Sequence, residues 1–253
     1  MAVRDDRRWR CAVTAVLARV PVSDQVADHI LGLLFSGELR TGDRIDLDAL
    51  AASLGVSRIP VREALAQLER DGITRTEHHR GAFVAEFDVG TVREAFELYA
   101  LLSGLTSARV ARRRDPGVVS ALAALNDEIA VVTDLDRFEA LARDFRRVIN
   151  LAAGGPHLRA LMRSFRGLVP AAARFGMAEA MPGEREYIRA ELDAIAGGDA
   201  ASAAGMAIGH IRHSGQCAIN GLVAAGIFAS ESAVSDEAPD ELLALIETLG
   251  ARQ

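Results

Sequence analysis

The stretch "GVSRIPVREALAQLERDG", residues 55–72, decides the fold, because it combines a turn, a helix start and a helix stop. Gly55 breaks the helical pattern before it. Pro60 falls in the first turn of the new helix, where its missing N–H costs little. One apolar stripe follows, formed by Val61, Leu65 and Leu68. Arg58 and Arg62 lie four residues apart on the opposite face, at the front of the helix.

The position of these two arginines needs a reason, since a cation at a helix N-terminus faces the positive end of the macrodipole. One interpretation is that Arg58 and Arg62 bind an external anion at some local cost to the helix. The other is that they are solvated surface residues, with Arg62 paired to Glu63 or Glu69. Residues 55–85 hold five arginines and four acids. Local net charge therefore leaves both interpretations open.

The flanking segments complete a helix-turn-helix pattern with a wing. "VSDQVADHILGLLF" predicts a helix with Ser23 as its N-cap, and "LDALAASLG" predicts the next helix. "ITRTEHHRGAFVAEF" reads as a β-hairpin around "HHRG". This wing presents His79 and Arg80 beside Gly81, where a glycine lets the backbone approach a phosphate.

The composition favours helices over a β-rich core. The chain has 253 residues, of which 50% are hydrophobic and only 5% aromatic. The net charge of −6 excludes a generally basic nucleic-acid coat, so any anion site must be local. Cys11 and Cys217 are far apart, which indicates a reducing compartment, and no apolar run of about 18 residues predicts a membrane span. We expect a cytoplasmic protein.

Four segments follow from these patterns: an arginine-rich arm (1–20), a winged helix-turn-helix domain (21–87), an antiparallel all-helical bundle (88–229), and a tail (230–253) that could form one helix. The fold class is therefore mainly α. Within the bundle we expect helices near 88–113, 117–132, 135–153, 157–177, 183–197 and 200–228. The breakers between them include "AGGP" and "MPGE".

The run "GELRTGDRIDLDALAASLGVSRIPVREALAQLERDGITRTEHHRGAFV" closely resembles the winged-helix domain of the GntR family of bacterial transcription regulators. "ELYALLSGLTSARVA" resembles the first helix of the helical effector (FCD) domain of its FadR subfamily. The resemblance covers roughly residues 22–228. It implies a homodimer that binds palindromic operator DNA, often as a repressor released by a small metabolite.

The resemblance also assigns DNA contacts. Those of the family fall on Arg58, Arg62 and Gly81, with Arg44 and Ser57 as contacts to the DNA backbone. Two positions depart from the family pattern. Ile59 replaces a common threonine, and Asp48 stands where some members carry a DNA-contacting arginine.

Many members of the subfamily hold a divalent metal in the bundle, on an Asp and a His four residues apart and on two later histidines. Those positions are here Ala142, Arg146, Ile188 and His210. One ligand of four does not hold a metal with useful affinity. We therefore predict no bound metal and no other cofactor.

Arg146 could replace the metal as the positive centre of an effector pocket. Its planar fork suits a carboxylate. His210 would be a second donor, and Tyr99 would make the pocket less polar. The predicted effector is thus a small anion, a carboxylate with an apolar body, bound by Arg146, His210, Tyr99, Ile188 and Ala142. Two alternatives stay open. Arg146 could turn outward with Arg143 and Arg147, or Asp144 or an inter-helix glutamate could neutralise it.

Other function classes fit less well. The sequence shows no Gly-rich phosphate loop, no Ser/His/Asp pattern and no paired metal carboxylates, so an enzyme is not expected. A regulator or interaction module that has lost its effector and metal site remains the alternative, because the metal ligands are eroded.

Overall fold

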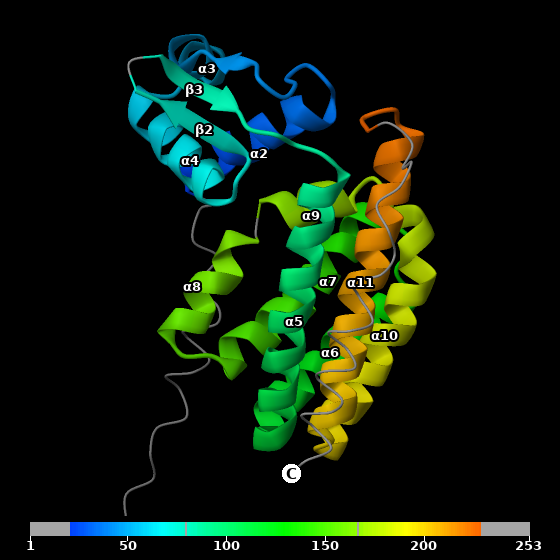
Figure 1. The fold of residues 1–253 in the computed structure, drawn as a ribbon. Helices are drawn as coiled ribbons and strands as arrows, with labels where there is room; N and C mark the ends of the chain where they lie inside the picture. Colours follow the sequence, from blue (N-terminus) through cyan, green and yellow to red (C-terminus); the bar gives the residue numbers. More distant parts are fainter. Residues whose placement is uncertain (1–20, 79, 166, 229–253) are drawn as a thin grey trace, which may run out of the picture.

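The structure, a computed structural model, describes residues 21–78, 80–165 and 167–228. Within those ranges it contains ten helices and one three-stranded sheet. Figure 1 shows a small winged domain at one end of a bundle of long helices. The predicted mainly α fold class, a winged helix-turn-helix followed by a helical bundle, is confirmed. The predicted arm (1–20) and tail (230–253) lie outside the described residues.

The winged domain begins with α2 (Val22–Phe35), followed by α3 (Leu47–Leu54) and α4 (Arg58–Arg70). The three helices share a core of fully buried aliphatic side chains. These include Ile30, Leu31, Val61, Leu68 and Ile73. Burying each such side chain stabilises the fold by about 1.5–3 kcal/mol.

Local chemistry sets the ends of these helices. The Asp46 carboxylate accepts hydrogen bonds from the backbone N–H of Asp48 and Ala49, which starts α3. Gly55 adopts φ 65°, a left-handed conformation that ends α3 at low cost. Ser57 is the N-cap residue of α4 but makes no side-chain cap bond. The predicted cap at Ser23 is wrong, because α2 begins at Val22, directly after Pro21.

The wing is the hairpin of β2 (Thr74–Glu77) and β3 (Gly81–Val84), as predicted. The strands are antiparallel, with Thr74 opposite Val84 and Glu77 opposite Gly81. A short strand β1 (Arg44–Ile45) pairs with the other edge of β3. The register places Arg44, from the segment before α3, opposite Phe83, and its side chain lies beside Gly81, the first residue of the wing's return strand.

Among its described residues, the helical domain contains seven helices. They are α5 (Val89–Arg113), α6 (Pro116–Val131), α7 (Leu135–Ala153), α8 (Pro156–Ser164), α9 (Leu168–Ala173), α10 (Met177–Gly197) and α11 (Ala200–Ala224). α5 and α11 lie side by side along most of their length (Figure 1). Two glycines allow this close approach: a Cβ on Gly104 would lie 2.8 Å from Ile208, and one on Gly215 would lie 2.8 Å from Phe96. Within the described ranges, no helix combines the length and apolar character needed to cross a bilayer.

Two helix predictions in this domain are wrong. The single helix expected near 157–177 is divided into α8, which ends at Ser164, and α9, which begins at Leu168. Gly167 lies at this break, and a Cβ there would be 3.2 Å from Leu31 of the winged domain, so the chain leaves the helix where it packs on α2. The break expected at "MPGE" does not occur, because α10 runs through Pro182. Proline removes only one hydrogen bond there, and the buried face of α10 beyond it keeps the helix packed.

An aromatic cluster joins the two domains. The rings of Phe35 and Phe175 lie 5.3 Å apart, and those of Phe35 and Phe87 lie 5.7 Å apart. Phe228 extends the cluster, 5.5 Å from Phe87. Such pairs contribute about 0.5–1.5 kcal/mol each beyond their buried area. The winged domain is thus packed on the end of the bundle through rings from the last residue of α2, the turn between α9 and α10, and the segments just before α5 and just after α11.

Candidate DNA-binding surface and effector site

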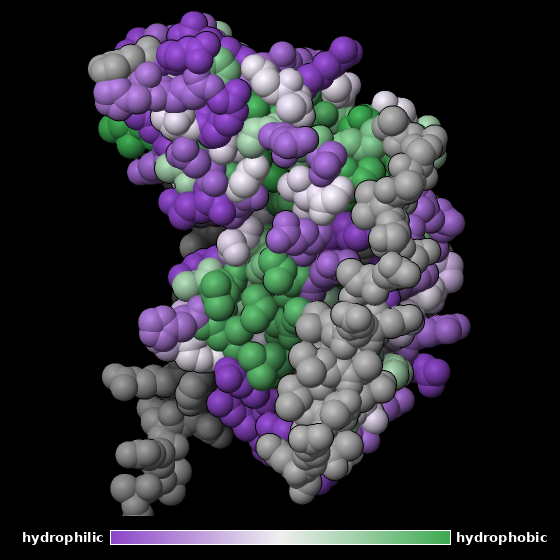
Figure 2. All heavy atoms as spheres, viewed as in Figure 1, coloured by the Kyte–Doolittle hydropathy of each residue, from purple (hydrophilic) through white to green (hydrophobic). Residues whose placement is uncertain are grey.

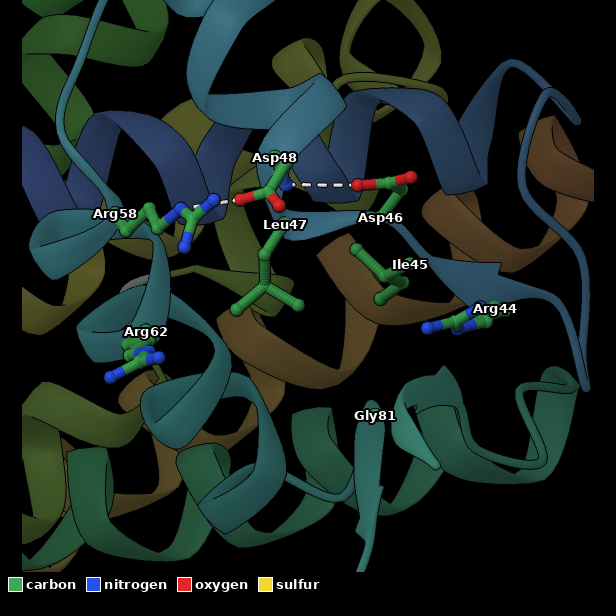
Figure 3. Close-up of a pocket in the computed structure, with 8 residues that line it drawn as sticks. All are labelled: Arg44, Ile45, Asp46, Leu47, Asp48, Arg58, Arg62 and Gly81. Atoms are coloured by element: carbon green, nitrogen blue, oxygen red, sulfur yellow. Dashed lines mark hydrogen bonds and ion pairs between the residues drawn. The ribbon is translucent and has the colours of Figure 1, made fainter. Parts of the chain in front are cut away.

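The exposed front of α4 faces an open hollow of about 200 Å³ (Figure 3). Its lining comes from β1, α3, α4 and the wing: Arg44, Ile45, Asp46, Leu47, Asp48, Arg58, Arg62 and Gly81. The structure therefore brings together four of the seven predicted DNA-binding residues, Arg44, Arg58, Arg62 and Gly81. All three arginines are exposed. Guanidinium groups presented in this way are suited to phosphates and to guanine edges.

Arg58 already has a partner within this surface. Its Nε lies 2.5 Å from Oδ1 of Asp48 on the first turn of α3. Both side chains are about two-thirds exposed, at 64% and 62%. Water screens such a pair, which contributes at most about 1 kcal/mol. The pair thus leaves Arg58 available for another anion, while Asp48 adds a negative charge to the surface.

Glu69, which could have paired with Arg62, is engaged elsewhere. Its carboxylate accepts hydrogen bonds from the N–H and the hydroxyl of Thr76 in β2, at 2.8 and 3.0 Å. Glu69 therefore ties α4 to the wing. Ile59, beside Arg58, is 68% exposed, which is unusual for a large apolar side chain.

The wing places Arg80 at the surface next to Gly81. Arg80 Nη1 lies 2.5 Å from Glu77, and its guanidinium lies 5.7 Å from the centre of the Phe83 ring. Gly81 has φ 106°, a region that L side chains rarely adopt, and a Cβ there would lie 3.4 Å from Nε of Arg44. The glycine is thus needed for the turn itself. Ser57 is exposed at the front of α4; His79 lies outside the described residues.

The second site lies inside the bundle, where Arg146 of α7 is buried with 5% exposure. Its Nη1 and Nη2 lie 2.8 and 2.6 Å from the two oxygens of Glu191 on α10. Nη1 also donates to the hydroxyl of Ser107 on α5, at 3.1 Å. The outward orientation considered for Arg146 is therefore wrong, and the inter-helix glutamate is the neutralising group. Burial alone would lower the pKa of Arg146, but the Glu191 carboxylate raises it.

A second buried polar pair lies beside the first. Nε2 of His210 on α11 lies 3.5 Å from Oε2 of Glu184 on α10, and both side chains are nearly inaccessible. Burial by itself would raise the pKa of the Glu184 carboxyl, yet the hydrogen bond and the charge of His210 hold it below its usual range. The other ring nitrogen of His210, Nδ1, is 3.5 Å from Nη2 of Arg146. His210 and Arg146 are thus neighbours, as expected.

The remaining predicted effector residues lie in the same interior but offer fewer polar groups to a ligand. Burial raises the pKa of the Tyr99 hydroxyl, which interacts with the side chains of Asn150 and Ser103. Ile188 is fully buried, and Ala142 is half-buried one turn before Arg146.

Sequence reasoning missed the two carboxylates, Glu184 and Glu191. A signal was present. The buried stripe of α10 runs through Glu184, Ile188, Glu191 and Ile195. Acids at stripe positions of an amphipathic helix indicate buried, paired charge.

The four positions that carry metal ligands in the subfamily do not fit a metal here. Three of them supply an alanine methyl, a guanidinium cation and an isoleucine, and only His210 supplies a donor. In the part of the chain that the structure describes, no three His, Cys, Asp or Glu side chains group closely enough to hold a metal ion. The absence of a resident metal remains a prediction.

Comparisons with known proteins identify two domains in the chain. The model of the bacterial regulatory proteins of the gntR family matches residues 22–84, and the FCD domain model matches residues 94–213. An uncharacterized HTH-type transcriptional regulator of Mycobacterium tuberculosis is 44% identical over 151 residues, which are 60% of this chain and 62% of that relative. The chain thus spans about three fifths of the length of the first relatives it matches.

Two further relatives agree with this assignment. A probable D-xylose utilization operon transcriptional repressor of Paenarthrobacter nicotinovorans is 29% identical over 59% of this chain and 67% of its own length. The solved structure of E. coli McbR/YncC matches with a TM-score of 0.57 and 21% identity, over 77% of this chain and 95% of that one, which shows the fold alone. With a winged domain and a helical domain matched in this order, the chain belongs to the GntR family of bacterial regulatory proteins and carries an FCD domain.

Proposed function

We propose that the protein is a transcription regulator that binds palindromic operator DNA as a homodimer, acts as a repressor in the cytoplasm and has no catalytic activity. The observation that carries this proposal is the exposed front of α4, where Arg58 and Arg62 project beside Arg44 and the wing glycine. A helix in this position enters the major groove, and an arginine grips guanine O6 and N7 with two donors. The relatives' names support DNA binding and, for one of them, repression.

The wing complements the helix in this mode of binding. Arg80 and the glycine backbone at Gly81 lie at the tip of the β-hairpin, where they reach a phosphate or the adjacent minor groove. The overall charge of −6 supplies no general attraction to DNA. Oriented contacts from these few residues must therefore provide the affinity.

The test uses the full chain and DNA from upstream of its own gene, with binding measured by fluorescence anisotropy. Arg58→Ala should weaken operator binding by about 1–3 kcal/mol if Arg58 reads a guanine. Arg70→Ala is the matched control, because Arg70 is exposed on the last turn of the same helix, away from the hollow. Equal affinities of the Arg58→Ala variant and the wild type would overturn the proposal.

The dimer has a suitable surface on α5. Figure 2 shows hydrophobic side chains gathered over this helix, and Leu98 and Leu105 are 47% and 43% exposed. Monomeric proteins rarely leave such a contiguous apolar stripe in water. The stripe consists of Leu98, Leu101, Leu102 and Leu105.

The order of residues in this stripe is symmetric. If two α5 helices cross antiparallel between positions 101 and 102, Leu98 meets the partner's Leu105 and Leu101 meets the partner's Leu102. In the same register, Glu94 meets the partner's Arg109, so opposite charges flank the leucines at both ends. A two-fold interface requires this self-complementarity. It places the two winged domains in one assembly, as a palindromic site demands.

The surroundings of Arg146 bear on the nature of the effector. A carboxylate metabolite at Arg146 has to displace Glu191, which holds both Nη groups of the fork. That observation favours the second candidate function, a DNA-binding regulator whose effector site is no longer open to an outside ligand.

A further inference from the structure

The contact between Arg146 and Glu191 has the geometry that a bound carboxylate ligand would have. Two parallel N–H···O bonds join the guanidinium to the two oxygens, at 2.8 and 2.6 Å. Ser107 also donates its hydroxyl to Glu191. Three helices, α5, α7 and α10, therefore converge on one carboxylate, and it belongs to the chain itself.

The surroundings leave no second position of this kind around the guanidinium. The Nη edge of Arg146 is occupied by Glu191, and Nη2 also faces His210. In the described ranges, Nε of Arg146 is buried without a hydrogen-bond partner. A single N–H does not provide a bidentate contact, so an outside carboxylate would need the place that Glu191 holds.

Replacing the Glu191 carboxylate at Arg146 by an outside carboxylate costs free energy. Glu191 is fully buried, in the middle of α10. An arriving acid would leave the Glu191 charge without its cation inside the bundle, and an unpaired buried charge costs several kcal/mol. Glu184 does not compensate, since it carries the same charge and faces His210.

We propose that Glu191 is the built-in occupant of the anion site of the helical domain, so that the wild-type domain does not respond to carboxylates, while small monocarboxylates bind Arg146 when the Glu191 carboxylate is removed. The inference rests on the proposed function only in taking the helical domain as the regulatory part. It names the ligand class of the site, a monocarboxylate, and explains why the intact chain excludes it.

Thermal unfolding of the full chain tests this inference by chemical rescue. Glu191→Ala removes the equivalent of one acetate ion and should lower the midpoint by about 10 °C, because it leaves Arg146 buried without an anion. Sodium acetate at about 100 mM should then restore about 4 °C relative to sodium chloride at the same ionic strength. The wild type should shift by less than about 1 °C. Acetamide, the neutral analogue, should restore nothing in either protein.

Two further variants make the result decisive. In Glu191→Ala with Arg146→Met, the cation is gone, so acetate should no longer raise the midpoint. Should Glu191→Ala fail to fold without acetate, Glu191→Ser is the second variant, because its short side chain also vacates the position of the carboxylate. Formate, the smallest monocarboxylate, is then the probe. Acetate stabilisation of the wild type equal to that of Glu191→Ala, or no rescue of either variant by acetate or formate, overturns the inference.

Operator binding separates this inference from the proposed function. We expect acetate or propionate at about 10 mM to change the wild-type operator affinity by less than about twofold, since neither enters the site. If the wild type binds no DNA at all, the proposed function fails, yet the thermal measurements still decide the role of Glu191.

Discussion

Nε of Arg58 lies 2.5 Å from Oδ1 of Asp48, so the arginine proposed to read DNA is paired with an acid on the preceding helix. The pair is visible in Figure 3, where a dashed line joins Arg58 to Asp48. On DNA, the Asp48 carboxylate would lie close to the phosphates, where it is repelled. Binding must also break or share the ion pair before Arg58 makes its full set of contacts.

Asp48→Asn should therefore tighten operator binding by about fivefold at about 0.1 M salt, because it removes one negative charge from the DNA-facing surface. The thermal stability should change by less than about 1 kcal/mol, since the pair is exposed. Anisotropy titrations at several salt concentrations measure the effect, which should shrink as salt rises. Asp127→Asn, at an exposed position of α6, is the control and should leave the affinity unchanged. Weaker binding by Asp48→Asn would show instead that Asp48 positions Arg58.

A second prediction concerns Asp71, which follows the last turn of α4. Partial burial raises the pKa of its carboxyl to about 6, from 3.8. One carboxylate oxygen is buried without a hydrogen-bond partner. The folded state binds this proton more tightly than the unfolded state, so stability falls as the pH rises from about 4 through 6 and stays low above that.

Asp71→Asn removes this titration. Because Asp71 is only half-buried, we discount the effect for solvent screening and expect about 1 kcal/mol of added stability at pH 7.5. Near pH 4 the variant and the wild type should differ little. Urea unfolding at several pH values measures both. A stability difference that does not change between pH 4 and 7.5 would contradict the raised pKa.

The same substitution should have opposite effects at two glycines of α11. A Cβ on Gly221 would lie 2.0 Å from the carbonyl oxygen of Phe175, where backbone cannot easily move, whereas Gly205 has no atom of this kind within 4 Å. Gly221→Ala should destabilise the protein by about 3 kcal/mol. Gly205→Ala, at an exposed helical position, should stabilise it by about 0.5–1 kcal/mol. Urea unfolding compares them, and equal stability of the two variants would refute this close contact of α11 with the turn before α10.

Local signals explain why much of this fold was predictable from sequence. Helix α7 has the predicted bounds, 135–153, because Asp134 accepts a bond from the N–H of Arg137 at its start and "AGG" follows at its end. The helices and the hairpin of the winged domain were predictable for the same reason, since Gly55, Pro60 and the "HHRG" sequence are local signals for a helix end, a helix start and a turn. Pro182 misled the prediction, because packing of the later turns of α10 outweighs one lost hydrogen bond.

The effector site was less predictable, for a physical reason. The sequence indicated burial of Arg146 as one alternative. Its partner, Glu191, is 45 residues away in the chain, so the pairing depends on how α7 and α10 pack. The position of Glu191 on the buried stripe of α10 indicates a buried acid, but no local rule identifies the cation with which it pairs. Similarly, the pairing of Arg58 with Asp48 depends on how α3 and α4 cross, although both residues had been singled out separately.

The symmetric stripe on α5 leads to the last prediction. In the proposed antiparallel register, Glu94 and the partner's Arg109 meet twice in each dimer, once at each end of the leucines. Glu94→Arg or Arg109→Glu alone brings like charges together at both ends, and each should weaken dimerisation about tenfold. The double variant Glu94→Arg with Arg109→Glu restores opposite charges and should recover most of the wild-type affinity. Sedimentation equilibrium measures all four proteins. If the double variant loses as much dimerisation affinity as the two single variants lose together, this register is excluded. The effects of independent surface charges on the affinity add, whereas the effects of two paired charges cancel when both are reversed.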